Sequence, residues 1–397
     1  DRGLILSGVT PRSRRDEEDP LAEVHGSCDE RFTAVREALA RNLEGDELGA
    51  SVAVDLDGET VVDLWGGHRD EDRTTPWTQD TIVNGWSTTK TVLALAALML
   101  VERGELDVDA PVGDYWPEFS SHGKKNVLVR HLLGHTSGVS GWDPPFSIKD
   151  MYDWETSTER LAAQAPWWEP GTAIGYHAFS QGFLVGEIVR RVSGVTLGTF
   201  FRTEIAEPLG ADFHIGTPAS EDHRIALVTP PPPLELLADI DLTSIPVRAL
   251  GNPLVDATQS REIAWRRAEL PAVNGHGNAR SVAAVQSVMA CGGTVGGTTV
   301  LSPAGCERAL LEQIHDVDLV LGARIRHGIG YGLVDPATSP LSRSDRACYW
   351  GGWGGSVVLV DMAARLCVAY VMNRMGPGTI GDIRAYSICE AASLSMR

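Results

Sequence analysis

The chain has 397 residues, more than the usual single domain of about 100–200, so its length predicts one large domain or two interlocked ones. Apolar residues make up 43% and charged residues 22%, an ordinary globular composition that excludes a fibrous or wholly disordered protein. With 34 Lys and Arg against 53 Asp and Glu, the net charge of −19 repels phosphate backbones and anionic lipids. Nucleic acid and membrane partners are therefore not expected.

The cysteines and the apolar segments bear on the compartment. Six cysteines lie far apart without a C-x-x-C pair, and a chain of this length does not need disulfides to fold. The first residues lack the apolar stretch of a secretory signal, although earlier processing could have removed one. The longest apolar run, Val92–Val101, is about half of the roughly 20 residues that cross a bilayer and predicts a buried helix. We therefore expect a cytoplasmic, reduced protein.

Apolar periodicity and turn residues predict the elements in chain order. A helix over 29–42 precedes two strands, over 50–56 and 60–64, joined at the Asp57-Gly58 turn. The later expected helices cover 88–103, 158–165, 181–192, 197–207 and 279–289, with one more past Ser302 and a last one from about Gly381. The later expected strands cover 349–352, 357–361 and 366–372. Strands near both ends around a helical middle predict an α+β fold with one antiparallel sheet built from the two chain ends.

The expected division follows from this order. Residues 1–28 form an N-terminal extension, residues 29–90 and 279–397 form the α/β sheet region, and residues 91–278 form the inserted helical region. Within the helical region, residues from about 217 to 273 contain the run Pro230–Pro233 and lack clear periodicity. This segment is predicted to be an excursion over the body of the protein.

The stretch Gly85-Trp86-Ser87-Thr88-Thr89-Lys90 places an S-x-x-K pattern at the start of the apolar helix. Residues three apart share a helix face, so Ser87 and Lys90 are expected side by side. A serine hydroxyl needs a neighbouring base to become a nucleophile, and a buried lysine can be neutral enough to serve. Alone the pattern is weak, because a helix cap followed by a surface lysine gives the same letters.

Three further segments make the pattern specific. They are Leu132–Gly138, Trp168–Tyr176 and the glycine-rich run Trp350-Gly351-Gly352-Trp353-Gly354-Gly355-Ser356. Together with the S-x-x-K they resemble the serine β-lactamase and penicillin-binding-protein superfamily, and within it the family VIII esterases and their class C β-lactamase-like relatives. The resemblance runs from about Glu30 to the C-terminus and implies a β-lactamase/DD-peptidase-like fold, an antiparallel sheet flanked by helices with a mostly helical insertion.

The resemblance also implies roles. Ser87 fills the place of the nucleophile, Lys90 and Tyr176 share the general-base work, and the backbone N–H groups of Ser87 and Trp353 form the oxyanion hole. One departure is Ala178, the third residue of Tyr176-His177-Ala178, where the family often has Asn. That substitution puts turnover of amides and β-lactams in doubt.

A second departure concerns the substrate. Trp350-Gly351-Gly352 stands where penicillin-recognising enzymes carry Lys or His followed by Thr-Gly or Ser-Gly. A tryptophan cannot pair with a carboxylate, so the sequence favours a neutral acyl substrate bound near Trp350, Gly351 and Gly352. His177 is a further substrate-binding candidate, with a solvent-facing loop histidine as the alternative. For Trp350 and Trp353 the alternative is core packing.

Several weaker signals complete the reading. His131 and His135 are four apart but lack the glutamate of H-E-x-x-H and a third ligand, so no metal and no cofactor are expected. The G-x-S-x-G pattern of another serine-hydrolase fold is absent from the sequence. His276, Asn278 and Arg280 are expected to give structural support. A dense aromatic set is predicted to supply part of a pocket wall: Trp142, Trp154, Trp167 and Trp168.

The sequence therefore predicts a serine hydrolase that cleaves small to medium neutral carboxylic esters through an acyl-enzyme on Ser87. An acyltransferase or lactonase with the same acyl-enzyme, or weak β-lactamase or D-aminopeptidase activity, remains an alternative. A penicillin-binding-like sensor is the alternative outside the enzymes, although a dead relative need not keep Ser87, Lys90 and Tyr176. A homo-oligomer is left open.

Overall fold

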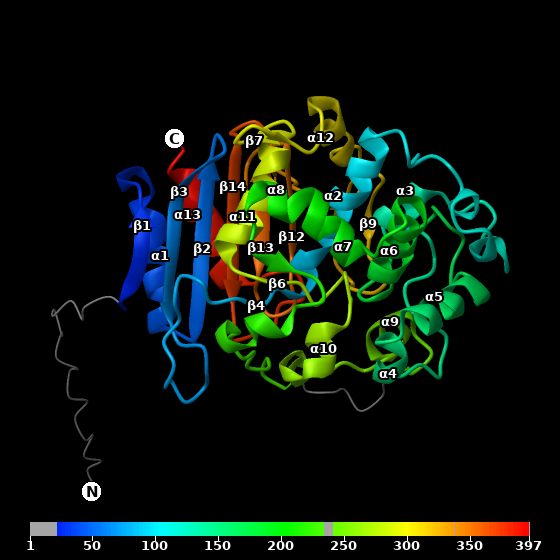
Figure 1. Cartoon of the computed structure of the whole chain (residues 1–397), viewed down its shortest axis with the longest axis horizontal. Helices are drawn as coiled ribbons and strands as arrows, with labels where there is room; N and C mark the ends of the chain where they lie inside the picture. Colours follow the sequence, from blue (N-terminus) through cyan, green and yellow to red (C-terminus); the bar gives the residue numbers. More distant parts are fainter. Residues whose placement is uncertain (1–21, 234–240, 338, 397) are drawn as a thin grey trace, which may run out of the picture.

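The structure, a computed structural model, describes residues 22–233, 241–337 and 339–396. Residues 1–21 of the expected extension and residues 234–240 of the expected excursion lie outside the described residues. A nine-stranded antiparallel sheet forms the centre, in the order β1-β3-β2-β14-β13-β12-β11-β10-β9 (Figure 1). Its strands are β1 Val24–Cys28, β2 Gly49–Leu56, β3 Glu59–Gly67, β9 Ile314–Val317, β10 Arg324–His327, β11 Gly332–Leu333, β12 Ala347–Gly351, β13 Val357–Asp361 and β14 Leu366–Met372.

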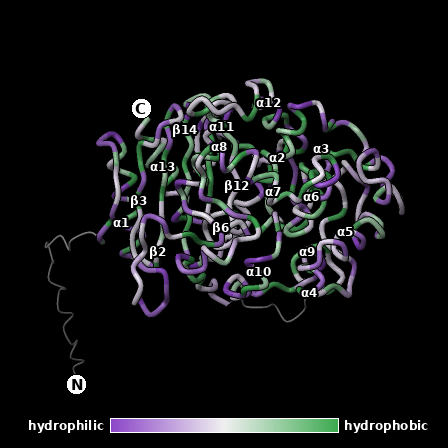
Figure 2. The backbone as a smooth tube through the Cα atoms, in the orientation of Figure 1, coloured by the Kyte–Doolittle hydropathy of each residue, from purple (hydrophilic) through white to green (hydrophobic). Residues whose placement is uncertain are grey.

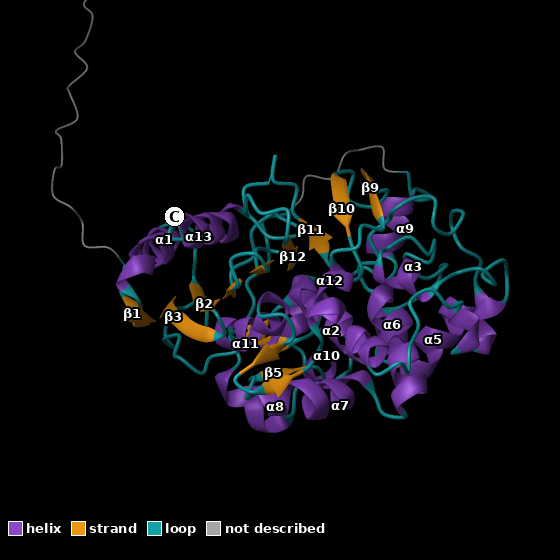
Figure 3. Cartoon of the chain, turned by 90° about the horizontal axis from the view of Figure 1, so that it is seen from above, coloured by secondary structure: helices purple, strands orange, loops and turns teal. Residues whose placement is uncertain are grey.

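The two chain ends meet inside this sheet, as the sequence predicts. Strand β14 pairs with β2 in a register that runs from Leu366 opposite Leu56 to Met372 opposite Ala50. The α-helix α11 (Ala279–Ala290) covers one face of these strands, and α1 (Thr33–Glu44) and α13 (Ile383–Leu394) cover the other (Figure 3). Because both faces are covered, β14 is buried along its whole length. The expected α+β sheet fold is confirmed.

The edges of the sheet differ from the expectation. Val24–Cys28, assigned to the N-terminal extension, forms the edge strand β1, which pairs with β3. On the opposite edge, β9, β10 and β11 were not predicted. The sequences of these strands are short or interrupted by polar residues and glycine, as in the exposed strand Ile314–Val317, so they lack the apolar alternation that signals a strand.

The helical region lies beside the sheet. Its central helix, α2 (Thr89–Glu102), is apolar all round and buried over most of its length, as predicted for 92–101, and it packs against α6 (Ser180–Ser193). Figure 2 places the hydrophobic residues mainly along the central strands and helices. Further helices are α3 Val129–Leu133, α4 Ile148–Met151, α5 Trp154–Ala163, α7 Leu197–Phe201, α8 Glu207–Leu209 and α12 Pro303–Ala309. The expected helix over 197–207 is divided by a π-helical turn, Arg202–Ala206. No helix in the described ranges is long and apolar enough to cross a membrane.

The segment expected as an excursion is more ordered than its composition suggests. Its described parts contain the short helices η6 Ala219–Arg224, α9 Ile245–Gly251, η7 Ala257–Arg261 and α10 Ile263–Arg267. Trp265 of α10 is fully buried, and its ring lies 5.5 Å from that of Trp86, the residue before Ser87. The prediction of an excursion over the body is therefore corrected for α10, which belongs to the core.

A small second sheet contains the strand that lies directly before the candidate site in the chain. It consists of β4 (Val83–Asn84), β6 (His276–Gly277) and β5 (Phe213–His214), with β6 in the middle. Strand β4 ends two residues before the 3-10 turn η2 (Trp86–Thr88), which contains Ser87. Antiparallel pairing of Asn84 with His276 therefore anchors the segment that precedes Ser87.

Candidate active site

Ser87 lies in η2, directly before α2, and only 5% of it is exposed. The preceding residue, Trp86, has φ = 48°, a left-handed conformation that is strained for a bulky side chain. Three contacts hold it there: its ring packs at 5.5 Å from Trp265 and 5.0 Å from Trp353, and its carbonyl accepts a 2.6 Å hydrogen bond from Thr89 Oγ1. The turn that presents Ser87 is thus fixed by tertiary packing.

Lys90, one helical turn later, is 2% exposed, and its Nζ lies 3.1 Å from Ser87 Oγ. The same nitrogen donates to the carbonyl oxygens of Ala178 at 2.7 Å and Ala272 at 3.0 Å. Burial lowers the pKa of the Lys90 amine well below its usual value. A neutral amine has two N–H groups and one lone pair, so the two carbonyls occupy the N–H groups and the lone pair is left facing Ser87.

Tyr176 is the second side chain that contacts Ser87 Oγ. Its hydroxyl donates to Ser87 Oγ at 2.6 Å, and its ring centroid lies 4.8 Å from Lys90 Nζ. Burial raises the pKa of the Tyr176 hydroxyl above its usual value, so the side chain is a neutral phenol at rest. The backbone of Tyr176 is held by the buried carboxylate of Asp318, whose Oδ1 accepts from the Tyr176 N–H at 3.1 Å.

The turn after β12 lies against the Ser87 turn. A Cβ on Gly352 would lie 2.5 Å from the carbonyl oxygen of Gly85, so only glycine permits this approach. Ser356 ties the two turns together, because its Oγ donates to Gly85 O at 2.8 Å and lies 3.0 Å from Thr88 Oγ1. Among the residues that the structure describes, neither the Ser87 N–H nor the Trp353 N–H has a hydrogen-bond acceptor.

An apolar cluster surrounds Tyr176. Trp350 is 1% exposed, and its ring lies 5.5 Å from that of Tyr176 and 5.8 Å from that of His135. Trp350 is therefore packed in the core and lies next to Tyr176. The cluster draws on α9, the 318–321 loop and β12, and its members are Trp167, Tyr176, Ala178, Phe179, Ile245, Ala249, Val320, Leu321, Trp350 and Ile380.

Two of the expected substrate contacts are corrected. His177 is fully buried rather than facing substrate or solvent, and both ring nitrogens already face protein oxygens at 2.6 Å, Ser137 Oγ and Gly175 O. Burial lowers the pKa of His177 to about 3, so it is neutral. Gly351 makes room for the chain at Ile380 and Gly381, not for the Ser87 turn. Of the two glycines, only Gly352 meets that turn.

Asn278 and Arg280 make structural contacts, in agreement with the supporting role that the sequence predicts. Asn278 caps α11 by accepting from the Ser281 N–H at 2.8 Å, and Arg280 pairs with Asp63 at 2.9 Å. Of the four tryptophans considered for a pocket wall, Trp167 joins the cluster around Tyr176. Trp142 is fully buried and stacks at 4.2 Å on Phe146 in the core.

Sequence reasoning missed several groups that build the site. Asp318 and Trp265 belong to no motif, and the carbonyls of Ala178 and Ala272 carry no side-chain signal at all. The strained φ of Trp86 could not be read from its identity either. Ser356 does have a sequence signal, because it is the last residue of the glycine-rich run.

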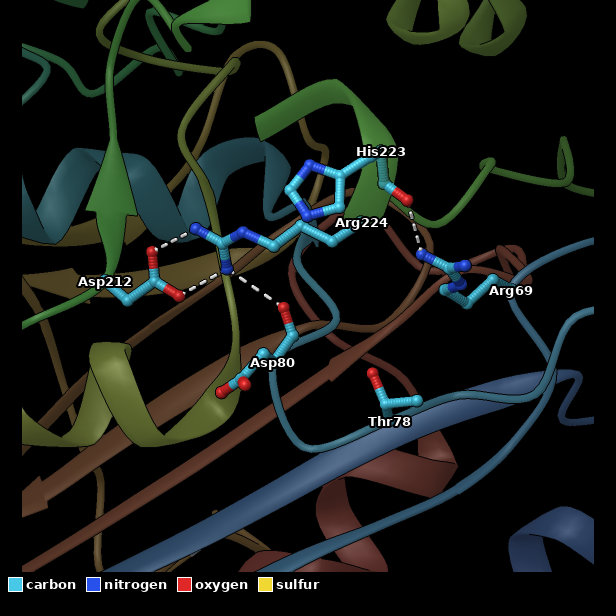
Figure 4. A pocket seen from close by; sticks show the side chains of 6 residues that line it. All are labelled: Arg69, Thr78, Asp80, Asp212, His223 and Arg224. Atoms are coloured by element: carbon cyan, nitrogen blue, oxygen red, sulfur yellow. Dashed lines mark hydrogen bonds and ion pairs between the residues drawn. The ribbon is translucent and has the colours of Figure 1, made fainter. Parts of the chain in front are cut away.

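A separate polar pocket of about 440 Å³ lies elsewhere, lined by Arg69, Thr78, Asp80, Asp212, His223 and Arg224 (Figure 4). In this pocket Arg224 forms an ion pair with Asp212 at 2.5 Å, and Arg69 donates to the main-chain carbonyl of His223 at 2.9 Å. It contains none of the predicted site residues.

Comparison with known proteins agrees with the fold. The family model described as Beta-lactamase matches residues 31–393. The chain is 32% identical to "Esterase/beta-lactamase LipL" of Mycobacterium tuberculosis over 94% of this chain and 88% of that protein. Among solved structures, a family VIII carboxylesterase has 40% identity and a TM-score of 0.89, covering 94% of this chain and all of that one. A penicillin-binding protein homolog from Caulobacter crescentus has 38% identity and a TM-score of 0.87, over 94% and 100%. The chain therefore belongs to the Beta-lactamase family.

Proposed function

We propose that this protein is a serine hydrolase that cleaves carboxylic esters of small to medium, neutral substrates through an acyl-enzyme on Ser87. The observation that carries the proposal is the contact of Ser87 Oγ with both Lys90 Nζ, at 3.1 Å, and the Tyr176 hydroxyl, at 2.6 Å. The esterase names of LipL and the family VIII carboxylesterase support the same activity.

In this mechanism the lone pair of Lys90 accepts the Ser87 proton as Oγ attacks the ester carbonyl. The oxyanion is received by the N–H groups of Ser87 and Trp353, and each such donor is typically worth about 2.7–4 kcal/mol of transition-state stabilisation. Tyr176 donates its hydroxyl proton to the leaving alcohol, and the proton that Lys90 took from Ser87 replaces it, so both side chains return to their starting states. Water then attacks the acyl-enzyme with the roles of these groups reversed.

The proposed preference for neutral substrates rests on the cluster around Tyr176. Trp350 stands where a carboxylate-binding lysine would be needed, and Ile245, Leu321 and Ile380 are partly buried apolar side chains of the same cluster. Burying a substrate carboxylate among such groups would cost free energy without a cation to compensate it. An ester with an apolar acyl or alcohol part loses nothing comparable.

Transfer of the acyl group to an alcohol or amine, or lactone opening, would use the same intermediate and stays an alternative. Weak β-lactamase or D-aminopeptidase activity stays a further one, supported by the β-lactamase part of the LipL name. Self-association remains a prediction that size-exclusion chromatography would test.

The test compares the native protein with Ser87→Ala on p-nitrophenyl acetate, p-nitrophenyl butyrate and nitrocefin. We expect ester turnover by the native protein, loss of at least about 1000-fold in Ser87→Ala, and a mass increase of one acyl group on the native protein alone. Native protein that forms no adduct and turns over no ester would contradict the hydrolase. If nitrocefin is much the better substrate, the ester preference is contradicted. If added alcohols speed up product release, the acyl group is being transferred to them.

A further inference from the structure

A buried charged network lies behind the turn that follows β12. Its centre is Arg384, the second residue of α13, whose side chain is 12% exposed. Its Nη1 binds the fully buried Glu47 at 2.7 Å, and its Nη2 binds Asp382 at 2.6 Å. The Tyr370 hydroxyl of β14 also donates to Glu47. Helix α13, strand β14 and the segment before β2 therefore converge on one guanidinium.

This network contacts the backbone of the turn directly. Arg384 Nη2 donates to the carbonyl oxygen of Gly354 at 2.8 Å, and the same oxygen accepts from the Gly376 N–H at 2.7 Å. The Gly354 N–H in turn donates to Gly378 O at 2.7 Å. Both polar groups of Gly354, the neighbour of Trp353, are thus fixed by groups outside the turn.

Glycines in the turn and in the segment that contacts it leave room for these contacts. A Cβ on Gly355 would lie 2.9 Å from both Arg384 Nη2 and Asp382 Oδ2, and one on Gly376 would lie 2.4 Å from Asp382 Oδ2. Gly355 also has φ = 137°, which glycine adopts without strain. The ion pair and the turn therefore fit each other at van der Waals distance.

We propose that Arg384 is a positioning residue that fixes the Gly352–Gly355 turn and so aims the Trp353 N–H at the oxyanion formed on Ser87. The role rests on the proposed acyl-enzyme chemistry and deepens it. Arg384 touches no reacting atom: it acts through Gly354 O, while Glu47 and Asp382 hold its guanidinium in one orientation. A planar guanidinium can bind two carboxylates and a carbonyl at once, which a lysine ammonium on a flexible stem cannot reproduce.

The test uses Arg384→Lys, which keeps a positive charge beside Glu47 and Asp382 and so avoids leaving buried carboxylates uncompensated. Assays at pH 8 keep Glu47 ionised, since burial raises its pKa to about 7. With p-nitrophenyl acetate we expect kcat to fall by about 10-fold or more and KM to change by less than about 3-fold, because an oxyanion donor acts in the transition state. Inhibition by phenylboronic acid, which forms a tetrahedral adduct on a serine, should weaken by a similar factor. Arg384→Met should move both quantities further in the same direction.

Arg191→Met is the matched control. Arg191 also pairs with a buried carboxylate, Glu187, at 2.7 Å, but it lies at the far end of α6. We expect Arg191→Met to lower the melting temperature, as Arg384→Lys should, while its kcat and its inhibition by the boronic acid stay at the native values.

Unchanged kcat in Arg384→Lys, or a loss confined to KM, would overturn the positioning role. Boronic acid binding needs no ester, so the two proposals fail separately. A native protein that binds the boronic acid but turns over no ester contradicts ester hydrolysis. Equal binding of the boronic acid by native protein and Arg384→Lys contradicts the role of Arg384.

Discussion

Lys90 illustrates how its surroundings change the chemistry of a single side chain. In water its amine would be protonated at neutral pH, but here burial lowers its pKa well below the usual value and two carbonyls take its N–H groups. Among the described residues, no carboxylate lies within ion-pairing distance of Lys90, and burial is the cause of its lowered pKa. The absence of such a partner keeps the amine available as a base.

Lys90 therefore predicts the pH profile. We expect kcat/KM for p-nitrophenyl acetate to rise with pH through the lowered Lys90 pKa and to be level well before pH 10, because only the neutral amine accepts the Ser87 proton. The stability of the fold should change with pH in the same direction. Because the unfolded chain binds the Lys90 proton more readily than the folded chain does, the contribution of Lys90 to the free energy of unfolding increases with pH. A kcat/KM that keeps rising beyond pH 10 would mean an ordinary lysine. Lys90→Arg should be inactive at every pH.

Gly352 is the second prediction at this scale. In Gly352→Ala the new methyl group would lie 2.2 Å from Ser356 Oγ and 2.5 Å from Gly85 O, and the backbone oxygen cannot rotate away. The two turns must separate, so we expect kcat to fall by about 10- to 100-fold, as small misplacements of catalytic groups do. Gly45→Ala is the control, since its nearest neighbour would be at 3.4 Å. Equal kcat for both variants would refute the close approach.

At the scale of elements, the short helix α10 supports the turn that presents Ser87. Trp265 fills the space beside Trp86, and its Nε1 donates to Asn84 Oδ1 at 3.0 Å. Asn84 Nδ2 donates in turn to Val273 O at 3.1 Å, so the end of the 217–273 segment and the strand before Ser87 hold each other. A helix of five residues would not be stable alone; tertiary packing maintains it.

Trp265→Ala tests this dependence. We expect a loss of about 3–5 kcal/mol in the free energy of unfolding, from guanidinium titration, and in addition a fall in kcat, because the strained Trp86 loses one of its contacts. Trp116→Ala, another buried tryptophan of the helical region, should cost similar stability. If both variants keep native kcat at temperatures where they are folded, α10 has no part in placing Ser87.

For the molecule as a whole, the sheet joins the two ends of the chain, so the sheet region and the helical region are interlocked. Helix α11 packs on β2, β13 and β14, which lie on both sides of the insertion in sequence. Asp55 of β2 accepts from Ser287 of α11 at 2.8 Å. Neither end can complete the sheet without the other, and we expect a single cooperative unfolding transition.

The cysteines give a test at the same scale. All six are free thiols, five of them are buried, and Cys28 on the edge strand is partly exposed. Burial raises the pKa of Cys306 to about 12 and that of Cys389 to about 12, so these thiols are protonated and unreactive. With Ellman's reagent we expect at most Cys28 to react in the native protein and all six thiols after unfolding in guanidinium without reductant. Fewer than six would reveal a disulfide.

The sequence by itself determined the α+β class, the central strands, α2 and the grouping of Ser87, Lys90 and Tyr176 as candidates. These follow from local periodicity and from a motif whose two members are one helical turn apart. Edge strands such as Val24–Cys28 could not be predicted from the sequence, because short, partly polar strands are stabilised by pairing with a neighbouring strand rather than by their own residue pattern.

Only the tertiary structure decided how the site is built. The burial that changes Lys90, the strained Trp86, the Asp318 carboxylate behind Tyr176 and the Arg384 network behind the Trp353 turn all bring together residues far apart in the chain. The tertiary structure also buries His177 against Ser137, although the neighbouring Tyr176 contacts Ser87. The sequence shows which chemical groups are present and how they are spaced, whereas desolvation and long-range contacts decide which of these groups can react.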